Sequence, residues 1–293
     1  MNIFTQSLAL ASIVFIAGCG AETQGGLEGE VSDIKTPYLG QTPPGLSPKL
    51  FAPEFISTGD LEIEGVFAPG MEEFYFTRQV NRDPINTHAV TYEGGEWSES
   101  LVGVSEGEVA ISTDGNIMYL GNKYKERTAS GWSETKSLGP DFEQFPIMRL
   151  TASAAGTYVF DERNELGILR LSRLIDGKRQ APEAFDEHIN SGTFTAHPFI
   201  ASDESYLIWD SKREGGFGDS DLYISFREVD GSWGPAINMG AEINTEFDDA
   251  FGSVTPDGKY FFFHRINLVE SDSESFANIY WVDAKVIENL RPE

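Results

Sequence analysis

Residues 255–265 read TPDGKYFFFHR, a tight-turn sequence followed directly by a run of aromatic residues. The Asp-Gly pair is typical of a hairpin turn, because glycine readily adopts the positive φ that such a turn requires. The aromatic run is typical of a strand that is buried in a sheet. The stretch therefore predicts a β-hairpin with a buried second strand.

Four more segments share this combination of a turn and an aromatic strand. They are APGMEEFYFTR (68–78), STDGNIMYLGNK (112–123), SAAGTYVFDER (153–163) and ASDESYLIWDSKR (201–213). Aligned on positions 72, 115, 156, 204 and 258, the five copies follow one another at intervals of 43, 41, 48 and 54 residues. A period of about 40–50 residues is typical of the four-stranded blades of a β-propeller.

The remaining strands of each unit are also visible in the sequence. Before each turn lies a short strand: 62–67, 107–112, 146–151, 197–202 and 251–256. A third strand follows the aromatic one, and a segment marked by Trp or Pro supplies a fourth. We therefore predict an all-β fold, a five-bladed β-propeller of four-stranded antiparallel blades, because such sheets bury their faces only against one another.

The fifth unit has no fourth-strand segment after residue 285. The N-terminal segment SPKLFAPEFIS (47–57) resembles the fourth-strand segments of the other units, especially WGPAINMGAEIN (233–244). We expect segment 47–57 to pair with the last blade and close the ring, which would cover an otherwise exposed strand edge.

The N-terminus predicts export and lipidation. Residues 8–18 (LALASIVFIAG) form an apolar run that is too short to span a bilayer and fits a signal peptide. The run ends at Cys19, the only cysteine of the chain, in a setting that resembles a bacterial lipoprotein box. We predict a signal peptide over 1–18, a flexible Gly- and Glu-rich tether over 19–36 and a single propeller domain over 37–293. Because Gly20 is not Asp, the resemblance favours the outer membrane, with the periplasmic or surface side left open.

The formal net charge of −26, from 21 Lys and Arg against 47 Asp and Glu, restricts the partners. Nucleic-acid binding requires a cationic face that releases counterions. Docking on anionic lipids by charge requires the same. The sequence also contains no phosphate-binding loop and no dinucleotide-binding glycine pattern, so no nucleotide is expected. The one membrane link that we expect is the lipid anchor.

The repeats resemble those of a known family. The Asp-Gly turn before an aromatic strand, KREGGFGDSDLYIS (212–225) and WGPAINMGAEINT (233–245) are similar to the WD-like repeats of TolB-type periplasmic β-propellers. The resemblance extends from about residue 37 to 285. It implies the propeller fold in an envelope protein and leaves the function open, because such propellers serve mostly in binding and assembly and in some cases as enzymes.

A polar mouth of the central channel is expected where first strands begin and second strands end. One basic residue stands at each second-strand end: Arg78, Lys123, Arg163, Arg213 and Arg265. His197, Trp209 and His264 each occur in one blade only and are further candidates to line this mouth. The cations either pair with acids of the rim or bind an anionic or sugar-like ligand as hydrogen-bond donors.

Catalytic signals are weaker than the fold signal. The candidate carboxylates for glycoside hydrolysis are Glu62, Glu64, Glu143, Asp248 and Asp249, in a chain so acidic that a facing pair arises easily by chance. Uronate lyase chemistry would need a base and a cation, which His197, His264, Arg213 and Arg265 supply. Asp219 and Asp221 are candidate calcium ligands; otherwise no cofactor is expected.

These observations favour a non-catalytic binding or scaffold module of the cell envelope, with a protein or a glycan as partner. The alternative is a carbohydrate-active enzyme, a glycoside hydrolase or a uronate lyase, that acts at the channel mouth.

Overall fold

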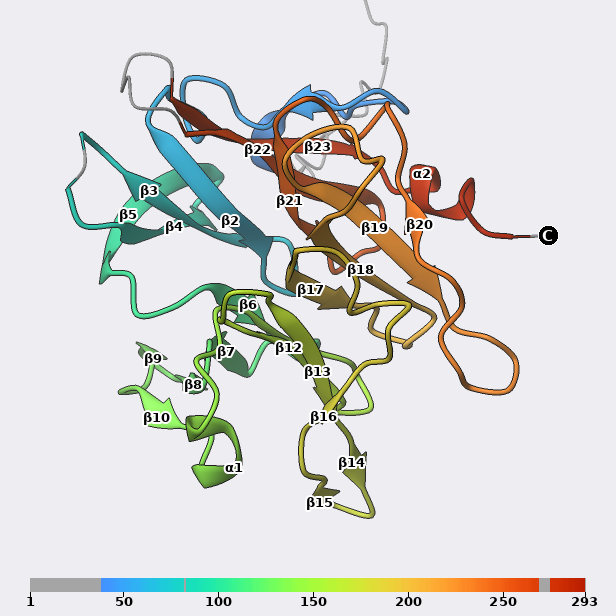
Figure 1. The fold of residues 1–293 in the computed structure, drawn as a ribbon. Helices are drawn as coiled ribbons and strands as arrows, with labels where there is room; N and C mark the ends of the chain where they lie inside the picture. The colour runs from blue at the N-terminus through green and yellow to red at the C-terminus, as the bar shows by residue number, and fades with distance from the viewer. Residues whose placement is uncertain (1–37, 82, 269–274, 293) are drawn as a thin grey trace, which may run out of the picture. The chain divides into compact units, whose positions relative to one another are not determined.

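The computed structural model describes residues 38–81, 83–268 and 275–292 (Figure 1). These residues all belong to one compact body, residues 35–293. The predicted signal peptide, Cys19 and all of the predicted tether lie outside the described residues. The regular secondary structure of the described part is almost entirely β, with three short helical elements: η1 (Tyr38–Gly40), α1 (Pro140–Glu143) and α2 (Lys285–Glu288). Within those ranges, none of the helices has the length and apolar character needed to cross a membrane.

The strands form consecutive antiparallel meanders, which we call units 1 to 5. Unit 1 contains β2 (Leu61–Phe67), β3 (Glu73–Gln79), β4 (Asn86–Glu93) and β5 (Glu96–Val104). Unit 2 contains β6 (Val109–Ile111), β7 (Ile117–Leu120), β8 (Lys123–Thr128), β9 (Gly131–Trp132) and β10 (Lys136–Ser137). Unit 3 contains β11 (Leu150–Ala152), β12 (Tyr158–Glu162), β13 (Ile168–Ser172), β16 (Glu183–Ala184) and the hairpin β14 (Leu174–Ile175) to β15 (Lys178–Arg179).

The last two units complete the chain. Unit 4 contains β17 (Phe194–Ile200), β18 (Tyr206–Lys212), β19 (Asp221–Phe226) and β20 (Ile237–Asn238). Unit 5 contains β21 (Asp248–Val254), β22 (Tyr260–Asn267), β23 (Phe276–Asp283) and, from the other end of the chain, β1 (Lys49–Leu50). The predicted first and second strand of every unit is therefore present.

The recurring turn is stabilised by its own side chains. In unit 5, the Asp257 carboxylate accepts hydrogen bonds from the Thr255 hydroxyl (2.7 Å) and from the Lys259 N–H (3.2 Å). The Thr255 hydroxyl oxygen in turn accepts the Tyr260 N–H at 3.1 Å, and Gly258 has a φ of 73°. Unit 2 repeats these contacts with Ser112 and Asp114. Because each bond spans only two to five residues, the turn forms from local sequence alone.

The aromatic strand β22 packs on both of its faces. Side chains alternate along a strand, so Phe262 enters a cluster with residues of unit 1, while Phe261 and Phe263 enter a cluster with residues of unit 4. Three further hydrophobic clusters join units 1 and 2, units 2 and 3, and units 3 and 4. Each unit thus buries its two faces against its neighbours, as the sequence predicts.

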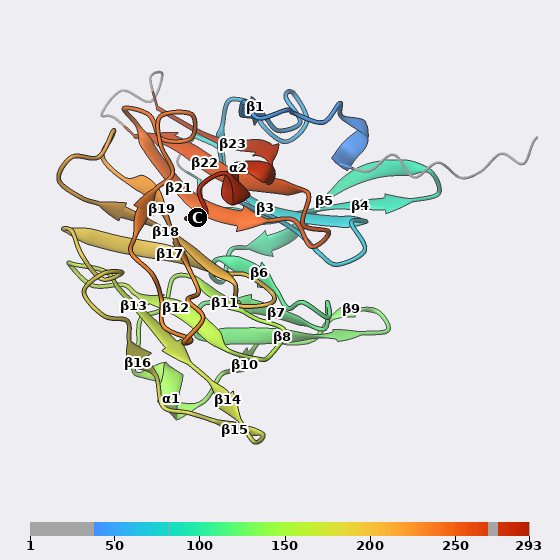
Figure 2. The same cartoon turned by 90° about the vertical axis from the view of Figure 1, so that its right-hand side faces the viewer.

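The N-terminal segment pairs with the last unit. In β1, Lys49 lies opposite Trp281 and Leu50 lies opposite Tyr280 of β23. Figure 2 shows β1 next to β23. The N–H of Phe51 then donates to the carbonyl of Ile279 at 2.8 Å. The pairing expected for segment 47–57 is present in β1, and β23 also meets β2 of unit 1 through one parallel pair.

Candidate functional site

Three first strands carry a β-bulge at the same place. The register of β2, β17 and β21 against the following strand shifts by one residue. The bulged residues Glu64, His197 and Phe251 have φ values of 64°, 47° and 57°, a backbone conformation that is unusual for residues other than glycine. A bulge redirects a side chain out of the regular alternation, and the surroundings must hold the strained conformation in place.

The neighbouring unit supplies that support. In each case the N–H of the bulged residue donates to a side chain on the second strand of the preceding unit. The bonds join Glu64 to His264 Nδ1 (3.0 Å), His197 to Asp161 Oδ2 (2.9 Å) and Phe251 to Asp210 Oδ1 (3.2 Å). The bonds connect unit 5 to unit 1, unit 3 to unit 4 and unit 4 to unit 5, so they fix the first strands relative to one another.

These contacts belong to a set of buried and partly buried ionisable residues, which we call the charged layer: Glu64, Glu108, Arg149, Asp161, His197, Asp210 and His264. Its centre is His197, whose Nδ1 lies 2.9 Å from Asp210 Oδ1 and whose Nε2 lies 3.6 Å from Glu108 Oε1. The His197 ring stacks on Phe251 with centroids 3.8 Å apart, and Phe251 stacks against His264 at 5.1 Å.

The two histidines of the layer differ in charge state. Burial alone would lower the pKa of His197, but the carboxylates of Asp210 and Glu108 outweigh it and raise this pKa to about 10. Burial, together with the charges of Arg149 and His197, holds the pKa of His264 well below its ordinary value. At neutral pH His197 is therefore a cation, and His264 is a neutral acceptor for the Glu64 N–H.

Two carboxyl groups of the layer are poorly solvated. Burial and the nearby Glu108 raise the pKa of Glu64 well above its ordinary value. Burial also raises the pKa of Glu108, to about 7, although the His197 cation opposes this shift. Glu64 Oε2 and Glu108 Oε2 have no hydrogen-bond partner among the described residues.

Two cavities flank the charged layer. The larger one, of about 550 Å³, is lined by residues from the ends of the first strands and the turns after them, and all five units contribute. We call it the turn-side cavity. A smaller one of about 250 Å³, the opposite cavity, is lined by His197, Asp210, Asp248 and Phe251 among others. Along β17, His197 faces the opposite cavity, whereas Phe199 and Ile200 line the turn-side cavity.

Arg149 connects the layer to the turn-side cavity. The residue lines that cavity, yet it is only 1% exposed. Asp161 holds its backbone: Asp161 Oδ1 accepts the Arg149 N–H at 3.0 Å, and the Asp161 N–H donates to the Arg149 carbonyl at 3.3 Å. Arg149 Nε and Nη1 are buried and have no hydrogen-bond partner in the described part of the chain.

Three of the five predicted mouth cations are engaged by protein atoms. Arg78 binds Glu62 (Nε to Oε1, 3.1 Å) and Arg265 binds Asp249 (Nε to Oδ1, 2.8 Å), in both cases within one unit. Arg213 donates to the carbonyl of Ile189 at 2.8 Å and lies over the Tyr223 ring. The cavity with contributions from all five units is at the other ends of the first strands.

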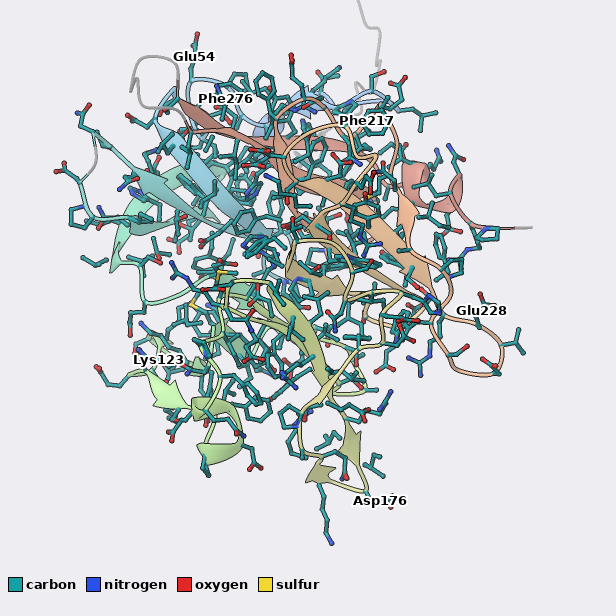
Figure 3. The ribbon with its side chains drawn as sticks, in the orientation of Figure 1. Glu54, Lys123, Asp176, Phe217, Glu228 and Phe276 are labelled. Carbon is teal, nitrogen blue, oxygen red and sulfur yellow. The ribbon has the colours of Figure 1, made fainter. Side chains whose placement is uncertain are left out.

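The remaining candidates are dispersed. Lys123 is exposed at the periphery (Figure 3), and Arg163 is exposed beyond the end of β12. Trp209 is fully buried in the hydrophobic cluster between units 3 and 4. Glu143 is exposed and accepts a hydrogen bond from Ser137, while Asp248 lines the opposite cavity and has a pKa raised by burial and by Asp219.

The two candidate calcium ligands have different surroundings. Asp219 is exposed and pairs with Lys212 at 2.8 Å. Asp221 is buried and accepts hydrogen bonds from the N–H groups of Phe217 and Gly218 and from Asn238, so it organises its own loop. No group of three or more acidic, His or Cys side chains with a geometry suited to a metal occurs among the described residues.

The structure brings Glu64, His197 and His264 together from the candidates that the sequence offered. It adds Glu108, Arg149, Asp161 and Asp210, none of which is among the candidates named from the sequence. A signal for Arg149 was present: it is a lone charge inside the first-strand segment PIMRLT (146–151).

The charges of the layer predict how stability changes with pH. The raised pKa of His197 stabilises the fold fully below its unfolded pKa of about 6.5, and this contribution is lost as pH rises toward 10. The raised pKa of Glu108 acts in the same direction between about pH 4.5 and 7. We expect a higher melting temperature at pH 6 than at pH 9.5, and a smaller difference in His197→Gln. A melting temperature that rises over this range would contradict the assignment.

Comparisons with known proteins give structural likeness only. No family model matches the chain, and no curated protein matches its sequence. Among solved structures, TolB from Acinetobacter baumannii is similar with 11% identity and a TM-score of 0.48, over 77% of this chain and 57% of that one. An endo-arabinase from Bacteroides thetaiotaomicron has 14% identity and a TM-score of 0.48, over 81% and 96%. A GH62 α-L-arabinofuranosidase catalytic domain from Coprinopsis cinerea has 10% identity and a TM-score of 0.46, over 81% and 94%.

This chain thus matches little more than half of the Acinetobacter TolB structure. At these TM-scores the likeness does not separate a binding protein from a glycan hydrolase. The description of the chain as an almost all-β protein of several antiparallel sheets rests on its own strand pairing.

Proposed function

We propose that this chain is a five-bladed β-propeller, closed by β1, that serves as a non-catalytic binding module and takes its ligand in the turn-side cavity. The architecture is supported by the contacts between successive units, including those of unit 5 with unit 1. It is further supported by the hydrophobic cluster between each such pair.

The observation that carries the function is the cavity itself. A concave, mainly apolar site with a few convergent polar groups is the usual form of a small-ligand site. The turn-side cavity has this character: its walls include Val66, Phe199 and Val254, and Arg149 contributes a buried guanidinium. Its volume of about 550 Å³ suits a small molecule or a few residues of a partner chain.

The state of the acids favours binding over catalysis. Glu62 and Asp249 are paired with arginines. Asp161 accepts three backbone N–H groups, and Asp210 holds His197 and the Phe251 N–H. Such carboxylates hold the fold together and are not free to act on a substrate.

One observation keeps a carbohydrate-active enzyme as the second candidate. Glu64 and Glu108 both have raised pKa values and one oxygen each without a partner among the described residues. A carboxyl group that stays protonated near neutral pH is a feature of a general acid in glycoside cleavage. In that case Glu64→Gln and Glu108→Gln would each abolish release of reducing sugar from a glycan.

A screen with a blocked cavity tests the binding function. Residues 38–293 are titrated with libraries of oligosaccharides, metabolites and short peptides, in parallel with Ala152→Trp, which fills the turn-side cavity. We expect a ligand whose affinity falls by about tenfold or more in Ala152→Trp, because displaced contacts of this size cost over 1 kcal/mol. The matched control is Ala129→Trp in the exposed β8–β9 turn. Equal affinity in both variants would place the ligand elsewhere and refute the cavity as the site.

We further propose that the protein acts in the bacterial cell envelope and is attached by a lipid on Cys19. The proposal rests on the apolar run 8–18 and the single cysteine that follows it. We expect the Cys19→Ser variant to move from the membrane fraction to the soluble fraction. Radiolabelled palmitate that never enters the wild-type protein would refute the anchor.

A further inference from the structure

We propose that the turn-side cavity recognises a carboxylate carried on an apolar body, with the Arg149 guanidinium as its partner. This inference rests on the proposed function, because it names the chemistry of the ligand that the cavity would take. Nothing in the resemblance to other propellers assigns this residue a role.

The first step is the state of Arg149. Burying an arginine is costly unless its charge and N–H groups are matched. Arg149 is 1% exposed, and its Nε and Nη1 have no hydrogen-bond partner among the described residues. Its backbone is held on both sides by Asp161, so the side chain is presented from a fixed position. A guanidinium that is pre-positioned and unpaired is suited to bind a planar anion.

The second step concerns the nearby acids, none of which among the described residues forms an ion pair or hydrogen bond with this guanidinium. Both Asp161 oxygens accept backbone N–H groups. The charge of Arg149 lowers the pKa of both Glu64 and Glu108, but burial outweighs this effect and both pKa values are raised. Glu108 lies 3.6 Å from His197. The other cation that lines the cavity, Arg291, is already paired with Glu288 at 3.0 Å. Arg149 is therefore the cation lining this cavity whose N–H groups remain available for a ligand among the described residues.

The third step excludes highly charged ligands. The cavity lining includes the acidic side chains of Asp203 and Glu288, and Glu108 lies near Arg149 in the charged layer. A phosphate dianion would be repelled by these carboxylates, whereas a monocarboxylate carries one charge to match one guanidinium. The walls supply apolar contact through Phe199, Ile200 and Val254, so the body of the ligand should be apolar.

Such a carboxylate has two sources, a small organic acid or the C-terminus of a peptide. The probes are octanoate with methyl octanoate, and acetyl-Val-Val-Phe as the free acid with its C-terminal amide, titrated calorimetrically into residues 38–293. We expect at least one acid to bind about tenfold or more tightly than its uncharged partner, which is the value of a hydrogen bond to a charged group. A preference for octanoate over its ester identifies a small organic acid as the source. A preference for the peptide acid over its amide identifies a peptide C-terminus.

Two variants assign the preference to Arg149. Arg149→Gln should abolish it, and Arg149→Lys should retain part of it, because a lysine keeps the charge and loses the planar fork. If Arg149→Gln does not fold, the acid and uncharged probes are compared on the wild-type protein and on Ala152→Trp. A preference for the acid that Ala152→Trp removes still places carboxylate recognition in the turn-side cavity.

The outcomes separate this inference from the proposed function. If the acids and their uncharged partners bind equally and Ala152→Trp abolishes this binding, carboxylate recognition is refuted, while the turn-side cavity remains the binding site. Carboxylate recognition is also refuted if none of the four probes binds. If no ligand of the wider screen is sensitive to Ala152→Trp, the proposed function fails as well.

Discussion

Replacing Asp210 by alanine is expected to lower the free energy of unfolding by about 3–5 kcal/mol, the usual cost of removing one partner of a buried ion pair. The change leaves the His197 cation without its 2.9 Å contact and the Phe251 N–H without its acceptor. At roughly 2–4 °C per kcal/mol for a domain of this size, the melting temperature should fall by about 6–20 °C. Circular dichroism during thermal and urea unfolding measures both quantities.

Asp219→Ala is the matched control. This aspartate belongs to the same unit, but it is exposed and pairs with the exposed Lys212. We expect a change within about 0.5 kcal/mol, because surface ion pairs contribute little. A double-mutant cycle of Asp210→Ala with His197→Gln should show strong coupling. A loss below about 1 kcal/mol in Asp210→Ala would mean that the charged layer does not stabilise the fold.

Removing residues 38–58 is expected to have the second large effect. The deletion takes away β1 and the buried side chains of Phe51 and Ile56. The Phe51 ring lies 4.7 Å from Phe262 and 5.1 Å from Phe74, measured between centroids. Loss of one such buried aromatic side chain costs about 3–5 kcal/mol. The whole segment therefore contributes an amount comparable to a typical total stability of about 5–15 kcal/mol.

We expect residues 59–293 to unfold without a cooperative transition near that of residues 38–293, as followed by scanning calorimetry. Phe51→Ala in the longer form should give an intermediate loss. The control is Leu46→Ala, which changes an exposed side chain just before β1. A melting temperature of residues 59–293 within about 2 °C of the longer form would refute the stabilising role of the segment.

The strand order was predictable because its determinants are local. Ser112 with Asp114 and Thr255 with Asp257 stabilise their turns through bonds that span only a few residues. The alternation in Phe261 to Phe263 indicates a strand buried on both faces. Such signals are read directly from short stretches of sequence.

The candidate site was harder to predict, and the mouth cations show why. Regular recurrence drew attention to Arg78, Arg213 and Arg265, but the structure uses these side chains to hold strand ends and carbonyls. The residues that face one another across the units are those that break the repeat, including Arg149 and His197. A repeat comparison emphasises what is shared, whereas a binding site in a repetitive fold depends on what differs.

The sequence by itself therefore determined the β-class, the units and the N-terminal strand that joins the last of them. Only the tertiary structure decided which charges meet. His197 binds Asp210 of its own unit and Asp161 of the unit before it. Glu64 meets His264, which is 200 positions away in the chain. The turns are set by contacts over a few residues, but these partners depend on how the apolar faces of separate units pack, and that packing is a property of the whole chain.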